Sequence, residues 1–358
     1  MVEKWGTFCL IVMTLPIMGH VVILPLMLDV AGRDGWISVL AAMPLGILFA
    51  YAIYRLRLKY PVPDFIAAFG RSAGKWVSLP LKALLAVYMY LLCIVSLAAL
   101  IDMIHIGFLP ATPIWILVAW FAVFCLYAAL KGIRAIALTA GILTILSMLT
   151  GHSVTLMANP NKEAGNLLPV LEFGLSAPLW GVAVLCSIWT ELLFLLLVPI
   201  ENIKEKRLFL LWTIGVLLNG LMMLSTLTGS VLIFGMGQAD EFMYPALEEV
   251  RIISLGIIDR FDIYGMMLMS YGCYIRTSLF LRLGYNLIFP SRIHSSFLGK
   301  ALLVLLGAGA AALASFLAND HFKMMEVTMA YAWLVVLYPL PFVLLMLPNQ
   351  KKERRLTV

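Results

Sequence analysis

The hydrophobic residues of this chain gather into ten long runs that are separated by short polar segments. The runs cover about residues 5–28, 36–56, 79–109, 114–130, 135–157, 179–200, 208–235, 253–287, 298–318 and 325–347. A helix needs about 20 mainly apolar residues to cross a bilayer core about 30 Å thick. The pattern therefore predicts an all-α membrane protein with ten transmembrane helices, forming one integral membrane domain over residues 1–358.

Basic residues alternate between the two sides of this predicted arrangement. All but five of the 25 Lys and Arg residues lie at the N-terminus, in alternate loops, or in the basic tail at 348–358. The five exceptions on the other side are Arg33, Lys162, Arg251, Arg260 and Lys323. Because cytoplasmic loops are enriched in Lys and Arg, we expect both termini and the tail to be cytoplasmic.

The composition is that of a membrane protein, and it gives no indication of nucleic-acid binding. Hydrophobic residues make up 63% of the chain and charged residues 12%, with a mean hydropathy of +1.01, which is far from a soluble domain. The net charge of +6 comes from the cytoplasmic loops, so it does not indicate nucleic-acid binding. The first run is too long for a cleaved signal peptide and lacks a clear cleavage site.

The sequence gives no sign of enzyme chemistry. It contains no Walker loop, dinucleotide fingerprint, zinc-protease motif or nucleophile elbow, so we expect no catalysis and no cofactor. The five cysteines lie inside apolar runs without paired spacing, which predicts reduced thiols and no metal site.

Ten spans divide into two sets of five that enter the membrane from opposite sides. This is the geometry of an inverted repeat, with repeat one at about 5–157 and repeat two at about 179–347. The first helix of such repeats is often broken at the substrate site. Pro16, Gly19 and Pro25 predict a break in the first run, because proline removes a backbone donor and glycine loosens the backbone.

The sixth run carries polar residues at helical spacing. Ser187, Thr190 and Glu191 lie at i, i+3 and i+4 and share one helix face. We therefore expect a ligand between the broken first helix and the middle of the sixth. The residues predicted to bind it are Met18, Gly19, His20, Ser187, Thr190 and Glu191.

Ionisable residues inside membrane helices are costly and usually face the protein interior. Glu191 is the deepest of them, and it serves either a ligand or a structural helix contact. His20 is either a ligand group or a hydrogen-bonded core histidine. Arg276 either snorkels towards the cytoplasm or has a buried use. Asp102 and His105 either reach the outer interface or point inward.

Two polar segments outside the spans predict local structure. Asp259, Arg260 and Asp262 are close in sequence at the outer end of the eighth run, and we expect a structural polar cluster there. The cytoplasmic link at about 57–78 has room for a short interfacial helix with Phe65 and Phe69 on one face.

Several short motifs together resemble the B subunit of GerA-type spore germinant receptors. They are Ala31–Trp36, Leu109–Trp115, Lys131–Arg134, Asn166–Val170, Tyr244–Arg251 and Ile258–Asp262. The resemblance runs from about residue 5 to 345. It implies the fold of the amino-acid/polyamine/organocation transporters, with ten helices in two inverted five-helix repeats of the LeuT type. It also implies a nutrient-binding subunit in the spore inner membrane, working with A and C subunits.

Two functions fit this fold. The first is a receptor in which a small nutrient, expected to be an amino acid, binds at the midplane and shifts a conformational equilibrium felt by the partner subunits. The second is a proton- or sodium-coupled amino acid transporter that works by alternating access. The resemblance favours the receptor.

The topology is testable by labelling single cysteines introduced into a variant without the native five. We expect Asp240→Cys to react with a membrane-impermeant reagent added outside, because the acidic link at 235–251 is predicted to be external. Glu353→Cys should react only after permeabilisation. Reversed labelling would contradict both the orientation and the inverted repeat.

Overall fold

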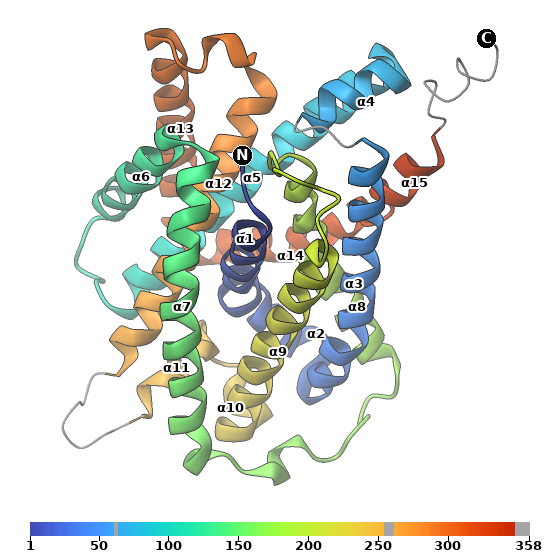
Figure 1. Ribbon diagram of the computed structural model, residues 1–358. Coiled ribbons are helices and arrows are strands. Elements are labelled where there is room, and N and C mark those ends of the chain that lie inside the picture. The colour runs from blue at the N-terminus through green and yellow to red at the C-terminus, as the bar shows by residue number, and fades with distance from the viewer. Residues whose placement is uncertain (61–63, 254–260, 348–358) are drawn as a thin grey trace.

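The computed structural model describes residues 1–60, 64–253 and 261–347, and these residues form a bundle of helices (Figure 1). Within these ranges the only β-structure is an isolated bridge between Val2 and Ile200, and no strand is present. The helices are α1 (Lys4–Ile17), α2 (Leu24–Ala31), α3 (Gly35–Lys59), α4 (Phe65–Ala73), α5 (Lys75–Gly107), α6 (Ile114–Lys131), α7 (Ile133–Ala158), α8 (Ser176–Trp189), α9 (Leu208–Phe234), α10 (Met236–Ala239), α11 (Pro245–Arg251), α12 (Asp262–Ile288), α13 (Phe297–Ala318), α14 (His321–Ala332) and α15 (Leu340–Met346).

Eight helical stretches in the described residues are long and apolar enough to cross a membrane. The first of them, Lys4–Lys59, has 56 residues and contains two of the predicted runs, and α12 is not among the eight. The all-α membrane fold is therefore confirmed, whereas the count of ten spans, the inverted repeats and the orientation stay predictions.

The first predicted span remains helical but changes its winding in the middle. The α-helix ends at Ile17, Met18–Ile23 forms a π-helical turn, η1, and α2 follows with Pro25 in its first turn. The Met18 amide donates to the carbonyl of Leu15 instead of that of Thr14, which an α-helix would require. Such π-helical turns occur frequently at functional sites.

The sixth predicted span changes its winding as well. The α-helix α8 ends at Trp189 and continues as the tighter 3₁₀ segment η5, Thr190–Leu196. Its C-terminal end is fixed to the N-terminus of the chain, because the Val2 amide donates to Pro199 O at 2.8 Å and the Glu201 amide to Val2 O at 2.9 Å. The middle of the bundle is thus built from two helices of irregular winding.

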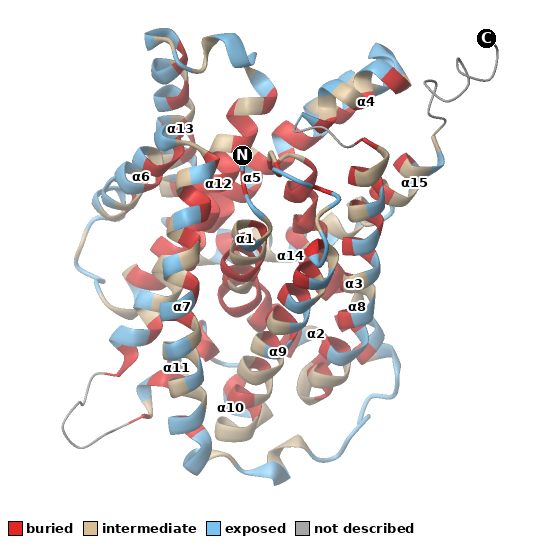
Figure 2. Cartoon of the chain, viewed as in Figure 1, coloured by how far each residue is buried: buried red, intermediate tan, exposed pale blue. Residues whose placement is uncertain are grey.

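Burial separates an inner set of helices from an outer set (Figure 2). In the most apolar 18 residues of each stretch, 78% of the residues are buried for Lys75–Gly107 and Ser176–Leu196. The share is 28% for Ile114–Lys131 and Phe297–Ala318. The outer helices expose large apolar side chains such as Trp120, Ile142 and Leu305. A surface of this kind suits lipid, which solvates apolar side chains but offers no hydrogen bonds.

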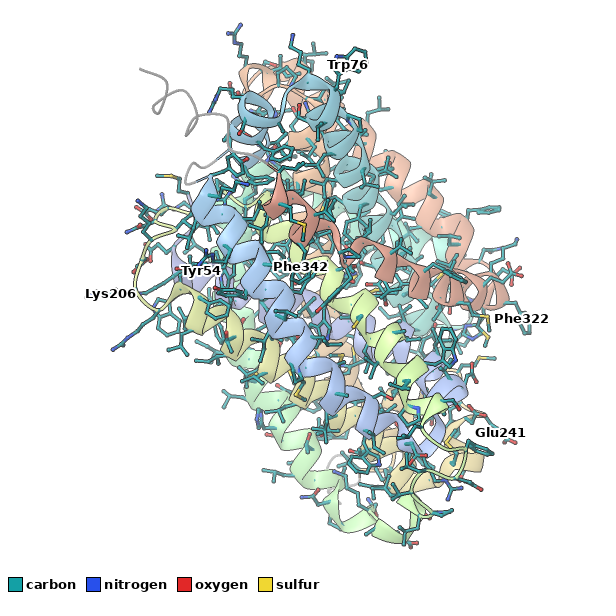
Figure 3. All side chains as sticks on the ribbon, turned by 90° about the vertical axis from the view of Figure 1, so that its right-hand side faces the viewer. Tyr54, Trp76, Lys206, Glu241, Phe322 and Phe342 are labelled. Carbon is teal, nitrogen blue, oxygen red and sulfur yellow. The ribbon has the colours of Figure 1, made fainter. Side chains whose placement is uncertain are left out.

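The short helix predicted in the link at about 57–78 is present as α4, and its interfacial position stays a prediction. Asp64 caps it by accepting a hydrogen bond from the Ala67 amide at 2.9 Å. Phe65 and Phe69 are both buried, and their rings stack 5.8 Å apart against Tyr60. Trp76, at the start of α5 just beyond this helix, and Glu241, in the acidic link, lie near opposite ends of the molecule (Figure 3).

Arg57, near the end of α3, fixes the end of the sixth span. Its side chain is fully buried, and the guanidinium donates to Leu196 O at 3.1 Å and to Val198 O at 3.3 Å. The Leu196 carbonyl ends the 3₁₀ segment and the Val198 carbonyl lies two residues beyond it. Both need partners, because a helix leaves its last carbonyls unpaired.

Replacing Arg57 with Met should therefore lower the free energy of unfolding by about 2 kcal/mol, since it leaves buried acceptors unpaired. Thermal unfolding of the purified protein in detergent measures this change. Arg55→Met is the matched control, because Arg55 lies two residues earlier on the same helix and its side chain is exposed. Equal stability of the two variants would contradict this function of Arg57.

Candidate functional site

The centre of the bundle holds a buried ion pair between Glu191 of η5 and Arg276 of α12. Both side chains are completely buried. Arg276 Nη2 donates to Glu191 Oε1 at 2.6 Å, and Nη1 donates to Oε2, so the contact is bidentate. Arg276 therefore does not snorkel to the cytoplasm, and Glu191 has a charged partner inside the protein. A pair of this geometry matches both charge and shape.

Three further elements bind the same pair. Arg276 Nε donates to Ser96 Oγ of α5 at 2.5 Å, and Nη1 donates to the carbonyl of Thr14 in α1 at 2.7 Å. Tyr331 of α14 donates its hydroxyl to Glu191 Oε1. In a regular α-helix the Thr14 carbonyl would accept a hydrogen bond from the Met18 amide, but here that amide donates to Leu15 O. The ion pair thus joins both irregular helices to α5, α12 and α14.

The remaining predicted residues of the sixth helix have hydrogen-bond partners within the protein. Ser187 donates to Val184 O at 2.5 Å, and Thr190 donates to Ser187 O at 2.7 Å. The Thr190 hydroxyl also lies 2.7 Å from that of Tyr88. Ser187, Thr190 and Glu191 are all fully buried. The three residues belong to one tightly packed polar region, and whether a ligand ever contacts them stays a prediction.

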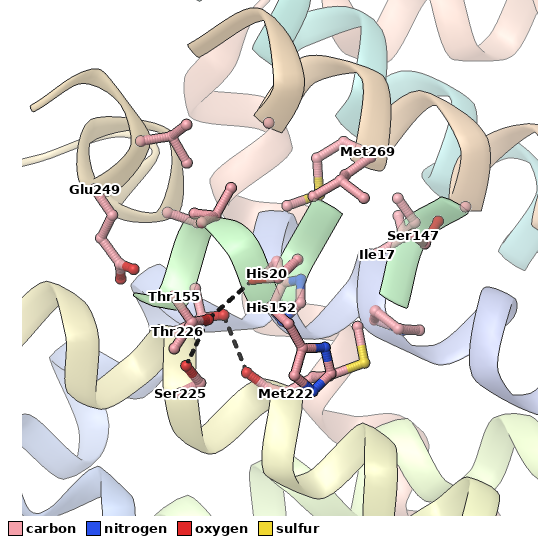
Figure 4. A pocket seen from close by; sticks show the side chains of 18 of the residues that line it. Ile17, His20, Ser147, His152, Thr155, Met222, Ser225, Thr226, Glu249 and Met269 are labelled. Carbon is pink, nitrogen blue, oxygen red and sulfur yellow. Dashed lines mark hydrogen bonds between the residues drawn. The ribbon is translucent and has the colours of Figure 1, made fainter. Parts of the chain in front are cut away.

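A cavity of about 360 Å³ lies beside the first helix, bounded by α7, α9, α11 and α12 (Figure 4). It extends from the middle of α1, at Val12, to Lys162 in the segment after α7 and to Glu249 in α11. Of the six residues predicted to bind a ligand, His20 lines this cavity, and the other five are not part of its lining. Gly19 instead faces α9, since a Cβ there would lie 2.7 Å from Met223.

Most of the cavity wall is apolar, and polar groups interrupt it at a few points. Ser147 and Thr155 come from α7 and Ser225 from α9, and the Thr155 and Ser225 hydroxyls lie 3.3 Å apart. His20 Nε2 and Ser147 Oγ are buried and have no hydrogen-bond partner among the described residues. An apolar site with a few unpaired polar groups is typical of small-molecule binding sites.

Glu249 of α11 is the buried carboxyl of this cavity. Its side chain is almost fully buried, and Oε1 accepts a hydrogen bond from Ser230 Oγ at 2.5 Å. Burial raises the pKa of Glu249 to about 8, although the Ser230 hydroxyl and the charge of Lys162 act in the opposite direction. The carboxyl group is therefore largely protonated at neutral pH in this environment.

A second buried polar contact lies next to the cavity, at Tyr244. Asp102 of α5 is buried, accepts a hydrogen bond from the Tyr244 hydroxyl, and lies 2.7 Å from His321 Nδ1. Asp102 therefore points inward, towards the segments that carry Tyr244 and His321. Tyr244 lines the large cavity and also a smaller one of about 170 Å³ that contains Asp29, Asp240 and Glu241.

The predicted outer cluster is described only in part. Asp259 and Arg260 lie outside the described residues. Asp262 is buried, with Oδ2 3.8 Å from Arg251 Nε. Arg251 in turn donates to Glu248 at 2.5 Å and to Gly107 O at 2.7 Å, so it links α11 to the end of α5. The structural function assigned to this cluster stays a prediction.

The cavity residues of α7 and α11 were not among those predicted from the sequence. A signal for the first group was present, because Ser147, Gly151 and Thr155 recur every four residues and therefore share one helix face. Glu249 gave no such signal. It follows Glu248 in an acidic link, and its burial depends on where α11 packs.

The buried pair predicts a specific pattern of stability. Glu191→Gln should lower the free energy of unfolding by about 3–5 kcal/mol, because it leaves the Arg276 guanidinium without a countercharge in an apolar interior. The double variant Glu191→Leu/Arg276→Leu should recover most of this loss. Thermal unfolding in detergent measures both, and Glu201→Gln, which changes an exposed carboxylate, is the control. A double variant no more stable than Glu191→Gln would contradict a paired function.

Comparison with known proteins agrees with these observations. The fold is similar to that of a Na⁺-coupled sialic acid symporter in its substrate-bound, outward-open state, with a TM-score of 0.67 over 95% of this chain and 79% of that one, at 13% identity. Spore germination protein XB of Bacillus anthracis is 29% identical over 265 residues, which are 74% of each chain. Spore germination protein KB of Bacillus subtilis strain 168 is 25% identical over 265 residues, 71% of this chain and 69% of that one.

The family model described as "Spore germination protein" matches residues 1–323, which is most of the chain. The resemblance noted in the sequence is thereby confirmed. The long apolar helices are those of an integral membrane protein. This chain is a member of the spore germination protein family, the Spore_permease family of membrane proteins.

Proposed function

We propose that this protein is the nutrient-binding B subunit of a germinant receptor and that an amino acid binds in the cavity beside the first helix. The observation that supports this best is the cavity of about 360 Å³. Its apolar wall carries two buried polar groups, His20 Nε2 and Ser147 Oγ, that have no hydrogen-bond partner in the part of the chain that the structure describes. Pockets of roughly 300–1,000 Å³ with few, convergent polar groups are the usual form of small-molecule sites.

The position of the cavity gives binding a route to the rest of the protein. Pro16, Ile17 and His20 line it from the segment where the first helix changes its winding. The Thr14 carbonyl, just before this segment, accepts a hydrogen bond from Arg276 at 2.7 Å. A ligand that prefers one winding of this segment shifts the equilibrium between conformations. The receptor needs only this difference in affinity between two states.

The wider assignment is also part of the proposal. It comprises ten spans in two inverted repeats, cytoplasmic termini, the spore inner membrane as location, and A and C subunits as partners. Family membership and the transporter fold support it. The partners would stabilise one conformation, so a shift in this chain would be passed on to them.

The location predicted from the sequence, between the first and sixth helices, remains a competing proposal. It shares His20 with the cavity but depends on Ser187, Thr190 and Glu191. In the described conformation these three residues use their hydrogen bonds within the protein. Binding there would require the Glu191–Arg276 pair to rearrange, which the cavity site does not require.

A coupled amino acid transporter is the second candidate, favoured by the similarity to a Na⁺-coupled symporter. Uptake distinguishes the two. Saturable, gradient-driven uptake of a labelled amino acid by the purified chain in liposomes would support the transporter. Binding without uptake would support the receptor.

Filling the cavity tests its function directly. Gly151→Phe should raise the half-maximal nutrient concentration at least tenfold, because Gly151 lines the cavity and its added side chain would occupy the ligand volume. The variant should fold, since a Cβ at Gly151 meets no atom within 4 Å. The measurement is ligand binding to the purified chain, followed by the nutrient response of spores that carry the variant.

Gly141→Phe is the matched control. Gly141 lies on the same helix, its added Cβ also meets no atom within 4 Å, and it is not part of the cavity lining. An unchanged response in Gly151→Phe together with loss of response in Ser187→Leu would place the ligand between the first and sixth helices instead.

A further inference from the structure

We infer that the Glu249 carboxyl group is the acceptor for the ammonium group of the ligand, so that the cavity selects small apolar molecules bearing a primary amine. This inference rests on the proposed function and specifies the ligand class of the same cavity. The carboxyl belongs to α11 in the external link, outside the two helices where the sequence predicted the site.

Packing around Glu249 holds its carboxyl group against α9, where Glu249 itself lines the cavity. The α9 position opposite Oε2 is Gly229, and a Cβ there would lie 2.7 Å from Oε2. The adjacent Ser230 hydroxyl holds Oε1 at 2.5 Å. Figure 4 shows the Glu249 side chain extending towards Thr155 and Thr226 on the cavity wall. A glycine that leaves room and a serine that orients the group together fix an acidic side chain inside an apolar site.

The charges near this carboxyl group leave it available for a cationic ligand. Arg251 lies two residues further along α11. It forms an ion pair with Glu248 at 2.5 Å and donates a hydrogen bond to Gly107 O at 2.7 Å. Lys162 is the cation that acts on Glu249, and its Nζ donates to Asn159 Oδ1 at 3.0 Å. The other titratable groups that line the cavity are His20, His152 and Tyr244. On the elements packed against α11, α2 carries Asp29, and α12 carries Asp262, Tyr264 and Tyr271.

The other residues that line the cavity determine which kind of molecule can carry the ammonium group. Five methionines line it, Met13, Met103, Met148, Met222 and Met269, with valine, leucine and isoleucine between them. Methionine side chains are flexible and adapt to ligands of different shape. His20 Nε2 and Ser147 Oγ are the unpaired groups that could hydrogen-bond a ligand carboxylate. Neutral apolar amino acids match this combination.

The pH dependence follows from the protonation of the empty site. The pKa of Glu249 is raised to about 8, so the carboxyl group is neutral below that pH and must lose a proton to bind an ammonium group. Affinity for the amine should therefore rise with pH, by at most about tenfold per unit, until the pH reaches about 8. A ligand without an amine should not show this rise.

The test is binding of paired probes to the purified full-length chain in nanodiscs. The probes are the apolar amino acids from glycine to phenylalanine, each compared with its 2-hydroxy acid, and isobutylamine, which lacks the carboxylate. We expect the unsubstituted chain to prefer at least one amino acid over its 2-hydroxy acid by tenfold or more at pH 8. Glu249→Gln should abolish that preference and the pH dependence, whereas Glu248→Gln on the same helix should retain both.

The outcomes separate this inference from the proposed function. If the unsubstituted chain binds none of the probes, the proposed function fails and this inference fails with it. If it binds an amino acid and Glu249→Gln binds it equally well with the same preference and pH profile, only the assignment of Glu249 is overturned. Thermal unfolding of Glu249→Gln shows that the variant is folded, since the amide can still accept the Ser230 hydrogen bond.

Discussion

The structure depends on one buried ion pair, that of Glu191 and Arg276. Charged groups inside a membrane protein are stable only when other protein groups compensate them, because lipid provides no hydrogen bonds. Here the compensation comes from five elements, α1, α5, η5, α12 and α14. Each of these helices is consequently held in register at the level of the pair, and a shift of one affects the hydrogen bonds of the others.

The pair also explains how the first helix keeps an irregular winding in the middle of a packed bundle. A π-helical turn displaces backbone hydrogen bonds from the α-helical pattern. The Met18 amide turns to Leu15, and the guanidinium of Arg276 donates to the carbonyl of Thr14. The core thereby stabilises a winding that an isolated helix would not adopt. The cavity lies against the same segment, so it is placed where a ligand could favour one winding over another.

Much of the architecture could be predicted from the sequence, because the long apolar runs alone determine where helices form in a membrane. In the described residues each of the ten runs contains a helix, and Phe65 and Phe69 correctly indicated the short α4. The depth of Glu191 and Arg276 was also visible. Their pairing was not, since 85 residues separate them and helical periodicity carries no information on which distant helices meet.

The cavity was harder to predict for a physical reason. A cavity is a gap left by helix packing, and its lining comes from segments far apart in the chain. The spacing of Ser147, Gly151 and Thr155 indicated one polar face, but only the packed structure shows that His20 and Glu249 lie around the same space. Glu249 in particular resembles any solvated acidic residue in sequence, and its burial follows from how α11 packs on α9.

The most direct test of this account is an experimental structure of the full-length chain with its bound amino acid. The account predicts density for the ligand in the cavity between Pro16, Met222 and Met269, with the Glu191–Arg276 pair intact. Ligand density between η1 and α8, with Arg276 separated from Glu191, would contradict it.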